Sequence, residues 1–330
     1  MEGLSLDVVK QLSPEAESPP GRRVLPMILR VLRGPHALRR WAVVSLIMNI
    51  LIVVTGGLVR LTGSGLGCPT WPRCTQDSYV SHPQLGIHGA IEFGNRLFTL
   101  VLVVAAVLTL VSALLYREDG QPRSDLRWLA GALALGIPLQ GVIGGIAVLT
   151  QLNPYVVGLH LLLSMVLIAL SVLLVRKTWY RRPAEASGMS VIATRITFVL
   201  MWLAVWLGTL VTGSGPHAGD EAAPRNALDG MLLTRLHSIV AYATVAATVA
   251  CFVLLRSRAV VLLLLVQMMQ AGIGIAQYQL GVPIQLVALH LLGASLAIAT
   301  VTNLVLSVLQ RSAHQAADAV GVSRLSSVAR

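Results

Sequence analysis

LQGVIGG (139–145) and VGLHLLLS (157–164) recur 130 residues further along the chain as MQAGIGI (269–275) and VALHLLGAS (287–295). The displacement is the same for both motifs, so the spacing inside the repeat is preserved. Both copies lie in long apolar stretches, and about 20 apolar residues are enough for a helix to span a bilayer. The repeat therefore predicts a duplicated, helical membrane protein.

Eight apolar stretches are long enough to span a membrane, and four of them belong to each copy. They cover roughly 41–60, 88–115, 127–149, 155–177, 192–211, 232–255, 258–279 and 285–310. Four helices per copy bring both copies into the membrane with the same orientation, which gives a parallel repeat. We predict an all-α, polytopic fold in which eight transmembrane helices form two pseudo-symmetric four-helix bundles.

The predicted halves are 41–178 and 191–311, joined by a basic linker (179–190). Two further segments, 1–40 and 312–330, are predicted to be N-terminal and C-terminal cytoplasmic tails. The first residues contain acidic side chains and no apolar core, so they match neither a secretory signal nor a transit peptide.

Composition and charge agree with a membrane protein. The 330 residues are 55% hydrophobic and 12% charged, and the mean hydropathy is +0.75. If the N-terminus is cytoplasmic, 20 of the 25 Lys and Arg residues fall in cytoplasmic segments. This is the positive-inside bias of a multi-pass protein. We therefore interpret the net charge of +11 as a signal of topology and expect no binding of nucleic acid.

Three histidines lie at matched depth in the predicted bundle. His160, His237 and His290 each stand five or six residues into a helix that starts at the outer face. A single intramembrane histidine is commonly a packing or hydrogen-bonding group, but the matched depth and the repeated context favour a ligand role. Neutral imidazole is the usual axial ligand of haem iron. His237 and His290 could clasp one haem between the sixth and eighth helices. Arg235 could meet a haem propionate or extend to the interface.

The first half is less regular in its second helix, HGAIEFGNRLF (88–98). Asn95 falls nearest the depth of His237, whereas His88 lies about 10 Å nearer the outside. The first site therefore uses either His88 after a shift, or His160 alone with an open coordination position.

One ion pair is predicted inside the same helix. Glu92 is the acidic residue that falls well within a predicted span, and Arg96 follows one turn later on the same face. The two could simply neutralise each other in the membrane. We favour a catalytic or substrate-facing carboxylate, because charged groups within a membrane usually mark function.

Cys68 and Cys74 lie in GLGCPTWPRC, in the large loop predicted to be outside. Their spacing permits a small disulfide loop in an oxidising compartment. A redox-active thiol pair is the alternative. The corresponding loop of the second half has no cysteine, so the fold itself does not require the pair.

Taken together, several motifs resemble the haem A synthase family over residues 40–310, in order. They are GGLVRLTGSGLGCPTWPRC (56–74), IEFGNR (91–96), the LH motifs at His160 and His290, and RLH (235–237). The resemblance implies an oxidoreductase of the bacterial plasma membrane, with both termini cytoplasmic. Its substrate is haem O, whose methyl group at ring position 8 becomes a formyl group through successive hydroxylations.

The resemblance also implies roles for individual residues. His237 and His290 would bind the iron of a resident haem b, with Arg235 nearby. In the first, catalytic half, His160 would bind the iron of the substrate haem and Glu92 would be the essential acid. Arg96, with either His88 or Asn95, would contribute to that substrate-haem site. Many members of the family carry His where this chain has Asn95.

The resemblance also implies that the protein lies in the lipid bilayer. It implies a haem O synthase and a terminal oxidase as possible assembly partners. It also matches the cysteine pair, as a disulfide or a redox couple. Two other functions fit parts of the sequence. A membrane b-type cytochrome that exchanges electrons with quinone would explain the histidines, and a haem-free transporter would explain the internal repeat.

Overall fold

The computed structural model describes residues 31–179 and 188–328, with side chains as far as Leu309. This described part contains eight long helices, each apolar enough to cross a membrane. They are α2 (Pro35–Leu61), α3 (Gly86–Leu115), α4 (Ser124–Leu149), α5 (Pro154–Lys177), α6 (Gly188–Ser214), α7 (Gly230–Leu255), α8 (Arg258–Gln279) and α9 (Ile284–Val328). A single turn, η2 (Pro83–Leu85), precedes α3, and a hairpin of β1 (Arg117–Glu118) and β2 (Gln121–Pro122) joins α3 to α4. The all-α, eight-helix prediction is confirmed.

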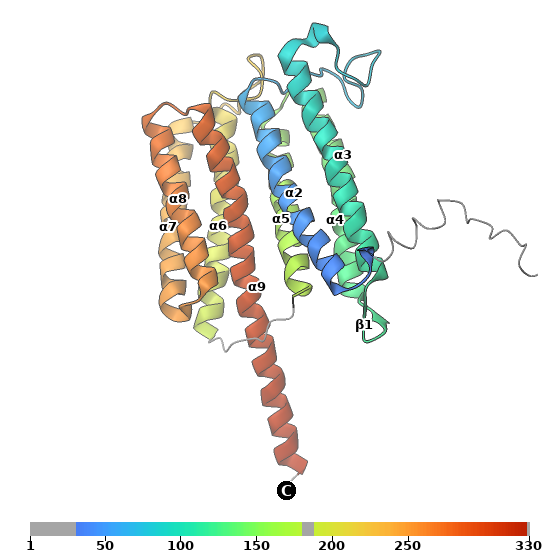
Figure 1. Ribbon diagram of the computed structural model, residues 1–330. Helices are drawn as coiled ribbons and strands as arrows, with labels where there is room; N and C mark the ends of the chain where they lie inside the picture. Colours follow the sequence, from blue (N-terminus) through green and yellow to red (C-terminus); the bar gives the residue numbers. More distant parts are fainter. Residues whose placement is uncertain (1–30, 180–187, 329–330) are drawn as a thin grey trace, which may run out of the picture.

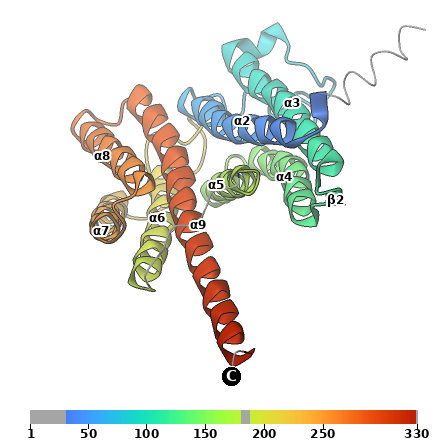
Figure 2. The ribbon, with the colours of Figure 1, turned by 60° about the horizontal axis from the view of Figure 1, so that its bottom comes forward.

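The helices form two bundles that lie side by side (Figure 1). In the first bundle each helix packs on its neighbours in the cycle α2, α3, α4, α5, and in the second the cycle is α6, α7, α8, α9. The view from below shows that α9 lies against α5 and α2, at the junction of the bundles (Figure 2). Gly57 of α2 permits this approach, because a Cβ at that position would lie 2.1 Å from Leu291 Cδ2.

The bundles share one apolar core at this junction. It contains Val53 of α2 and Ile168 of α5 together with Val301 and Leu304 of α9. In a bilayer, close packing of this kind is a main source of helix association, since lipid is as apolar as the side chains. The two halves are therefore held in a fixed relation to each other.

The helix ends follow local sequence signals that hydropathy does not detect. Several helices begin before the predicted apolar spans, and α2 starts at Pro35 because proline suits the first turn of a helix. The side chain of Asn153 caps α5, and that of Asp229 caps α7. Of the predicted tails and linker, residues 1–30, 180–187 and 329–330 lie outside the described residues.

The internal repeat is visible in a partly buried hydrogen bond that occurs once in each bundle. Gln140 Nε2 donates to the carbonyl of His160 at 3.0 Å, and Gln270 Nε2 donates to the carbonyl of His290 at 3.0 Å. These bonds fix α4 on α5 and α8 on α9 in the same register. As a result, the two histidines take equivalent positions in their bundles.

Candidate functional site

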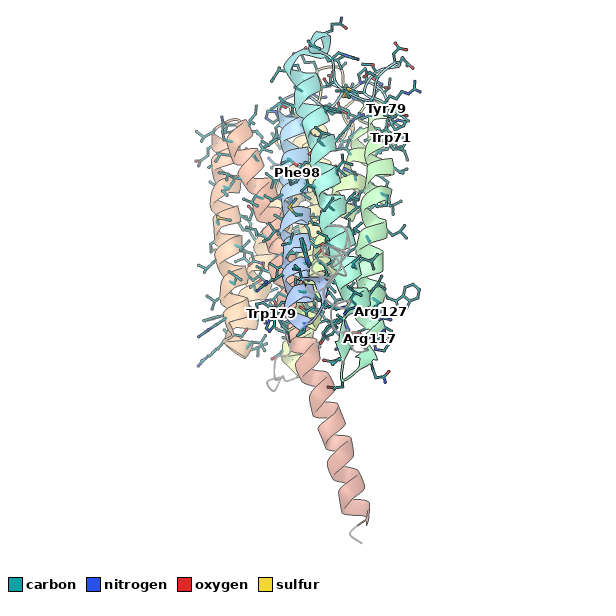
Figure 3. The ribbon with its side chains drawn as sticks, turned by 45° about the vertical axis from the view of Figure 1, so that its right-hand side comes forward. Trp71, Tyr79, Phe98, Arg117, Arg127 and Trp179 are labelled. Atoms are coloured by element: carbon teal, nitrogen blue, oxygen red, sulfur yellow. A yellow bond between two sulfur atoms is a disulfide. The ribbon has the colours of Figure 1, made fainter. Side chains whose placement is uncertain are left out.

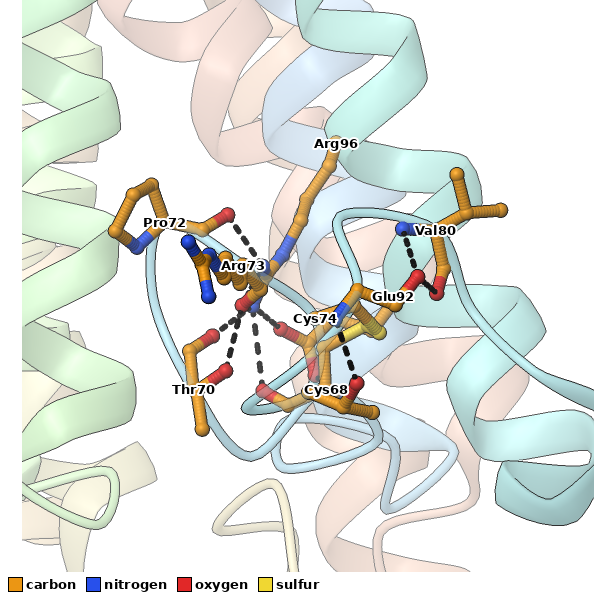
Figure 4. Close-up of a disulfide and its surroundings, with 10 residues drawn as sticks. Cys68, Thr70, Pro72, Arg73, Cys74, Val80, Glu92 and Arg96 are labelled. Atoms are coloured by element: carbon orange, nitrogen blue, oxygen red, sulfur yellow. Dashed lines mark hydrogen bonds and ion pairs between the residues drawn. A yellow bond between two sulfur atoms is a disulfide. The ribbon is translucent and has the colours of Figure 1, made fainter.

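A buried ion pair lies at the loop end of the first bundle (Figure 4). Glu92 and Arg96 are one turn apart on α3, and Arg96 Nη2 contacts Glu92 Oε1 at 2.5 Å. The second carboxylate oxygen, Oε2, accepts a hydrogen bond from the backbone N–H of Cys68 at 2.6 Å. Glu92 is only 5% exposed. Both oxygens of this carboxylate are therefore held by charge-assisted hydrogen bonds.

Arg96 also organises the loop that carries the cysteines. Its guanidinium donates to the carbonyls of Cys68 at 3.2 Å, Thr70 at 3.1 Å and Arg73 at 3.2 Å. Cys68 and Cys74 form a disulfide, and both residues are completely buried. The disulfide alternative of the sequence analysis is therefore the form found in the structure. We refer to residues 68–74 as the disulfide loop.

The disulfide loop reaches across the end of the bundle to α4. A Cβ placed on Gly145 would lie 2.3 Å from the indole ring of Trp71, so the ring packs directly on the glycine backbone. The equivalent position in the second half is Ile275, where no such approach is needed. Trp71 and Tyr79 lie at one end of the molecule, opposite Arg117 and Arg127 (Figure 3). The ion pair is thus covered by a loop that is anchored on two helices.

Two imidazole rings face each other inside the second bundle. The ring centroids of His237 on α7 and His290 on α9 are 6.4 Å apart. An iron between the two rings would be about 2 Å from each ligating nitrogen, and each nitrogen is about 1 Å from the centre of its ring. The two ring centroids would then be roughly 6 Å apart. His237 Nδ1 bonds the carbonyl of Ala204 at 2.9 Å, which leaves Nε2 free. Buried His290 Nδ1 has no hydrogen-bond partner among the described residues. This donor set fits a haem iron held between two neutral histidines.

A glycine on the preceding helix packs against each of these histidine rings. A Cβ on that glycine would lie within 3.3–3.6 Å of ring atom Cε1, so a larger side chain would take the space of the imidazole. The pairs are Gly208 with His237, Gly274 with His290, and Gly144 with His160. On α2 and α3 the corresponding pair is Gly56 and Asn95, since a Cβ placed on Gly56 would lie 3.9 Å from Asn95 Nδ2.

In the first bundle the structure brings Asn95, and not His88, to the position that matches His237. Asn95 Oδ1 accepts a hydrogen bond from Thr55 Oγ1 of α2 at 2.8 Å. His88 is exposed, and its Nδ1 bonds the hydroxyl of Ser64, in the turn after α2, at 2.9 Å. His160 lies on α5, with Nδ1 buried and without a hydrogen-bond partner among the described residues.

Beside Asn95 lies a cavity of about 340 Å³ between α2 and α3. Apart from Thr55 and Asn95 its lining is apolar, and it contains Leu58, Ile91 and Phe98. Arg235, the predicted propionate partner, is exposed near the start of α7, where its Nη2 contacts Met231 Sδ at 3.4 Å. Arg235 precedes His237 by two residues on α7. Its contact with a haem propionate stays a prediction.

Sequence reasoning missed several residues of this region. The contacts of Thr55 and Ser64 were not predicted, because their partners are distant in sequence. Arg60 is held by the second half, with Nε donating to the carbonyl of His217 at 2.7 Å and Nη2 to that of Thr212 at 2.9 Å. The glycines beside the histidines could have been found from the repeat, because Gly144 and Gly274 occupy the same place in LQGVIGG and MQAGIGI.

Comparison with known proteins gives an independent result. A family model described as cytochrome oxidase assembly protein, COX15-CtaA, matches residues 39–302. A protein of Geobacillus thermodenitrificans named heme A synthase is 36% identical over 149 residues, which is 44% of this chain and 45% of that protein. One of Listeria monocytogenes serovar 1/2a with the same name is 29% identical over 182 residues, 53% of this chain and 58% of that protein. The chain spans about half the length of the curated relatives it matches.

Proposed function

The chain belongs to the COX15-CtaA family of cytochrome oxidase assembly proteins, and we propose that it is a haem A synthase, which oxidises the C8 methyl group of haem O to a formyl group. The relatives named heme A synthase support this function. The observation that carries it is the duplicated histidine site. One copy has the separation needed for an iron between two imidazoles, and in the other the matching helix carries a buried carboxylate, Glu92, one turn from Asn95.

In the second half, His237 and His290 would hold haem b as the resident cofactor. When bound, haem b supplies one-electron transfer to or from the first half. The hydrogen bond from His237 Nδ1 to the carbonyl of Ala204 fixes the ring orientation and directs Nε2 away from the backbone. Gly208 and Gly274 leave the space that the two rings occupy. Arg235 is suited to meet a propionate at the outer rim.

In the first half, His160 would bind the iron of the substrate haem O. The C8 methyl group of haem O would be hydroxylated twice, each step removing two electrons from the carbon to an external oxidant, and the resulting gem-diol would lose water to give the aldehyde. Glu92 would accept a proton, or stabilise developing positive charge, beside the reacting carbon. It is three residues from Asn95 on α3, so both side chains lie on one face of the helix. Arg96 and the Cys68 N–H hold the carboxylate in place until substrate enters.

The setting follows from the same proposal. Eight apolar helices and bacterial relatives support a bacterial multi-pass membrane protein. We place it in the plasma membrane with both termini cytoplasmic and the disulfide loop outside, because most of its cationic residues lie at the opposite end of the helices. A haem O synthase would deliver the substrate, and a terminal oxidase would receive the product.

The test is expression in a bacterial host that makes haem O but no haem A, followed by chromatography of the extracted haems. The intact chain should yield hydroxylated and formylated haem, and Glu92→Ala and His160→Ala should yield neither. Full product formation by Glu92→Ala would remove Glu92 from the mechanism. A chain that keeps its haem but forms no oxidised product would instead be a b-type cytochrome, and a colourless chain would fit a transporter.

A further inference from the structure

The two bundles provide an internal comparison for the side chain at position 95. In each half, one ligand position lies on the fourth helix, at His160 or His290, and the hydrogen bond from the glutamine gives both the same register. The other ligand position lies on the second helix of the half and is packed on a glycine of the first. That position is His237 in the second half and Asn95 in the first.

His88 does not replace the missing imidazole. It lies seven residues before Asn95, and a rise of 1.5 Å per residue puts it about 10 Å nearer the end of the helix. Its ring is tied to the buried hydroxyl of Ser64, and its backbone carbonyl lies 2.2 Å from the position of a Cβ on Gly67. The close packing of His88 on the turn after α2 prevents the helix from sliding inward. The imidazole therefore stays at the mouth of the bundle.

The amide of Asn95 has a defined orientation. Thr55 Oγ1 donates to its carbonyl oxygen, so that oxygen is already engaged and the NH₂ group carries the remaining hydrogen-bonding capacity as a donor. The Nδ2 atom of the same amide would lie 3.9 Å from a Cβ on Gly56, so the NH₂ group lies beside the backbone of α2. An amide nitrogen has no lone pair available for iron.

We propose that the substrate haem iron takes a single protein ligand, His160, and that Asn95 faces its other side as a hydrogen-bond donor and not as a ligand. This inference rests on the proposed function, because it concerns the haem of the first half. The two haem sites would then differ in the number of protein ligands to the iron. The second-half iron is saturated by two imidazoles, whereas the first-half iron keeps one axial position free for a small molecule.

The test uses carbon monoxide as a probe of that free position. The full chain is expressed with a haem O synthase, purified, reduced without oxygen and titrated with carbon monoxide. Half of the bound haem should bind carbon monoxide, and the other half should remain six-coordinate and low-spin. Asn95→His should abolish carbon monoxide binding and make all of the haem low-spin, because it recreates the His237 arrangement.

Two matched variants separate the possible ligands. His88→Ala should leave the spectra unchanged. Asn95→Ala should keep carbon monoxide binding and raise the C–O stretching frequency, since the donor is lost. The inference is overturned if the wild type takes up haem in both halves and binds no carbon monoxide, or if the first half takes up no haem. Restored binding in His88→Ala or Asn95→Ala would then identify that side chain as the second ligand. If the spectra agree but the extracted haem is never oxidised, the proposed function fails while the ligand assignment stands.

Discussion

Replacement of Arg96 by alanine should release the disulfide loop. The guanidinium holds three loop carbonyls at 3.1–3.2 Å and the carboxylate of Glu92 at 2.5 Å. Removing one partner of a buried ion pair costs about 3–5 kcal/mol, because the other charge stays buried and uncompensated. The Arg96 side chain is 23% exposed, so the lower end of this range applies. We expect the free energy of loop opening to fall by about 3 kcal/mol, which is a roughly 100-fold increase in the open population.

The rate of disulfide reduction measures this opening. Cys68 and Cys74 are completely buried, so a water-soluble phosphine can reach them only when the loop opens. At low phosphine concentration, the rate of thiol appearance in Arg96→Ala should therefore exceed the wild-type rate by about 100-fold.

Arg73→Ala is the matched control within the loop. Arg73 is exposed, donates to the carbonyl of Gln76 at 2.8 Å and stands 5.4 Å from the ring of Tyr79. Exposed contacts of this kind contribute at most about 1 kcal/mol, so the reduction rate should rise no more than about fivefold. Equal rates in Arg96→Ala and the wild type would refute the view that Arg96 anchors the loop.

Three further substitutions test other contacts. Gly145→Ala should displace the indole ring of Trp71 and raise the quenching of tryptophan fluorescence by aqueous iodide. Gly141→Ala is the control, because its Cβ would meet nothing within 4 Å. Equal quenching in both variants would contradict the packing of Trp71 on α4. Arg60→Ala removes two charge-assisted hydrogen bonds to the second half and should lower stability by about 3 kcal/mol, measured as a lower melting temperature in detergent. Asp229→Ala removes the cap of α7 and should cost about 1 kcal/mol, whereas Asp229→Asn should recover most of the melting temperature.

The sequence predicted the fold well because the bilayer imposes simple rules. Every backbone group in the membrane must be bonded within a helix, so each apolar stretch becomes one helix, as it does from α2 to α9. The exact helix ends escaped prediction, because they depend on caps such as Asn153 and Asp229 and on proline at the start of α2. Hydropathy measures only the part of the helix that lies in lipid.

The candidate site was predictable only where its residues share a helix or a repeat. The spacing of Glu92 and Arg96 predicts an ion pair, and the repeat predicts equal depth for His160 and His290. The bonds from Glu92 to the Cys68 N–H and from Arg96 to the loop carbonyls depend on the path of the loop. No pattern of spacing along the sequence encodes that path.

The asymmetry of the two halves indicates that the helix itself does not require the ion pair. If Asn95 corresponds to His237, then Glu92 and Arg96 correspond to Thr234 and Ser238. Both hydroxyls bond carbonyls of their own helix, Thr234 to Gly230 at 2.7 Å and Ser238 to Thr234 at 2.9 Å, and α7 forms without a charge at either position. Charged side chains within a membrane are costly, so the first half must gain something from them that the helix itself does not need. Arg96 holds the disulfide loop, and the carboxylate of Glu92 is available for the proposed chemistry. The first half, which has these two charges, also has Asn95 at the position where the second half has the imidazole of His237. This difference is expected if the oxidation takes place in the first half and the second half exchanges electrons.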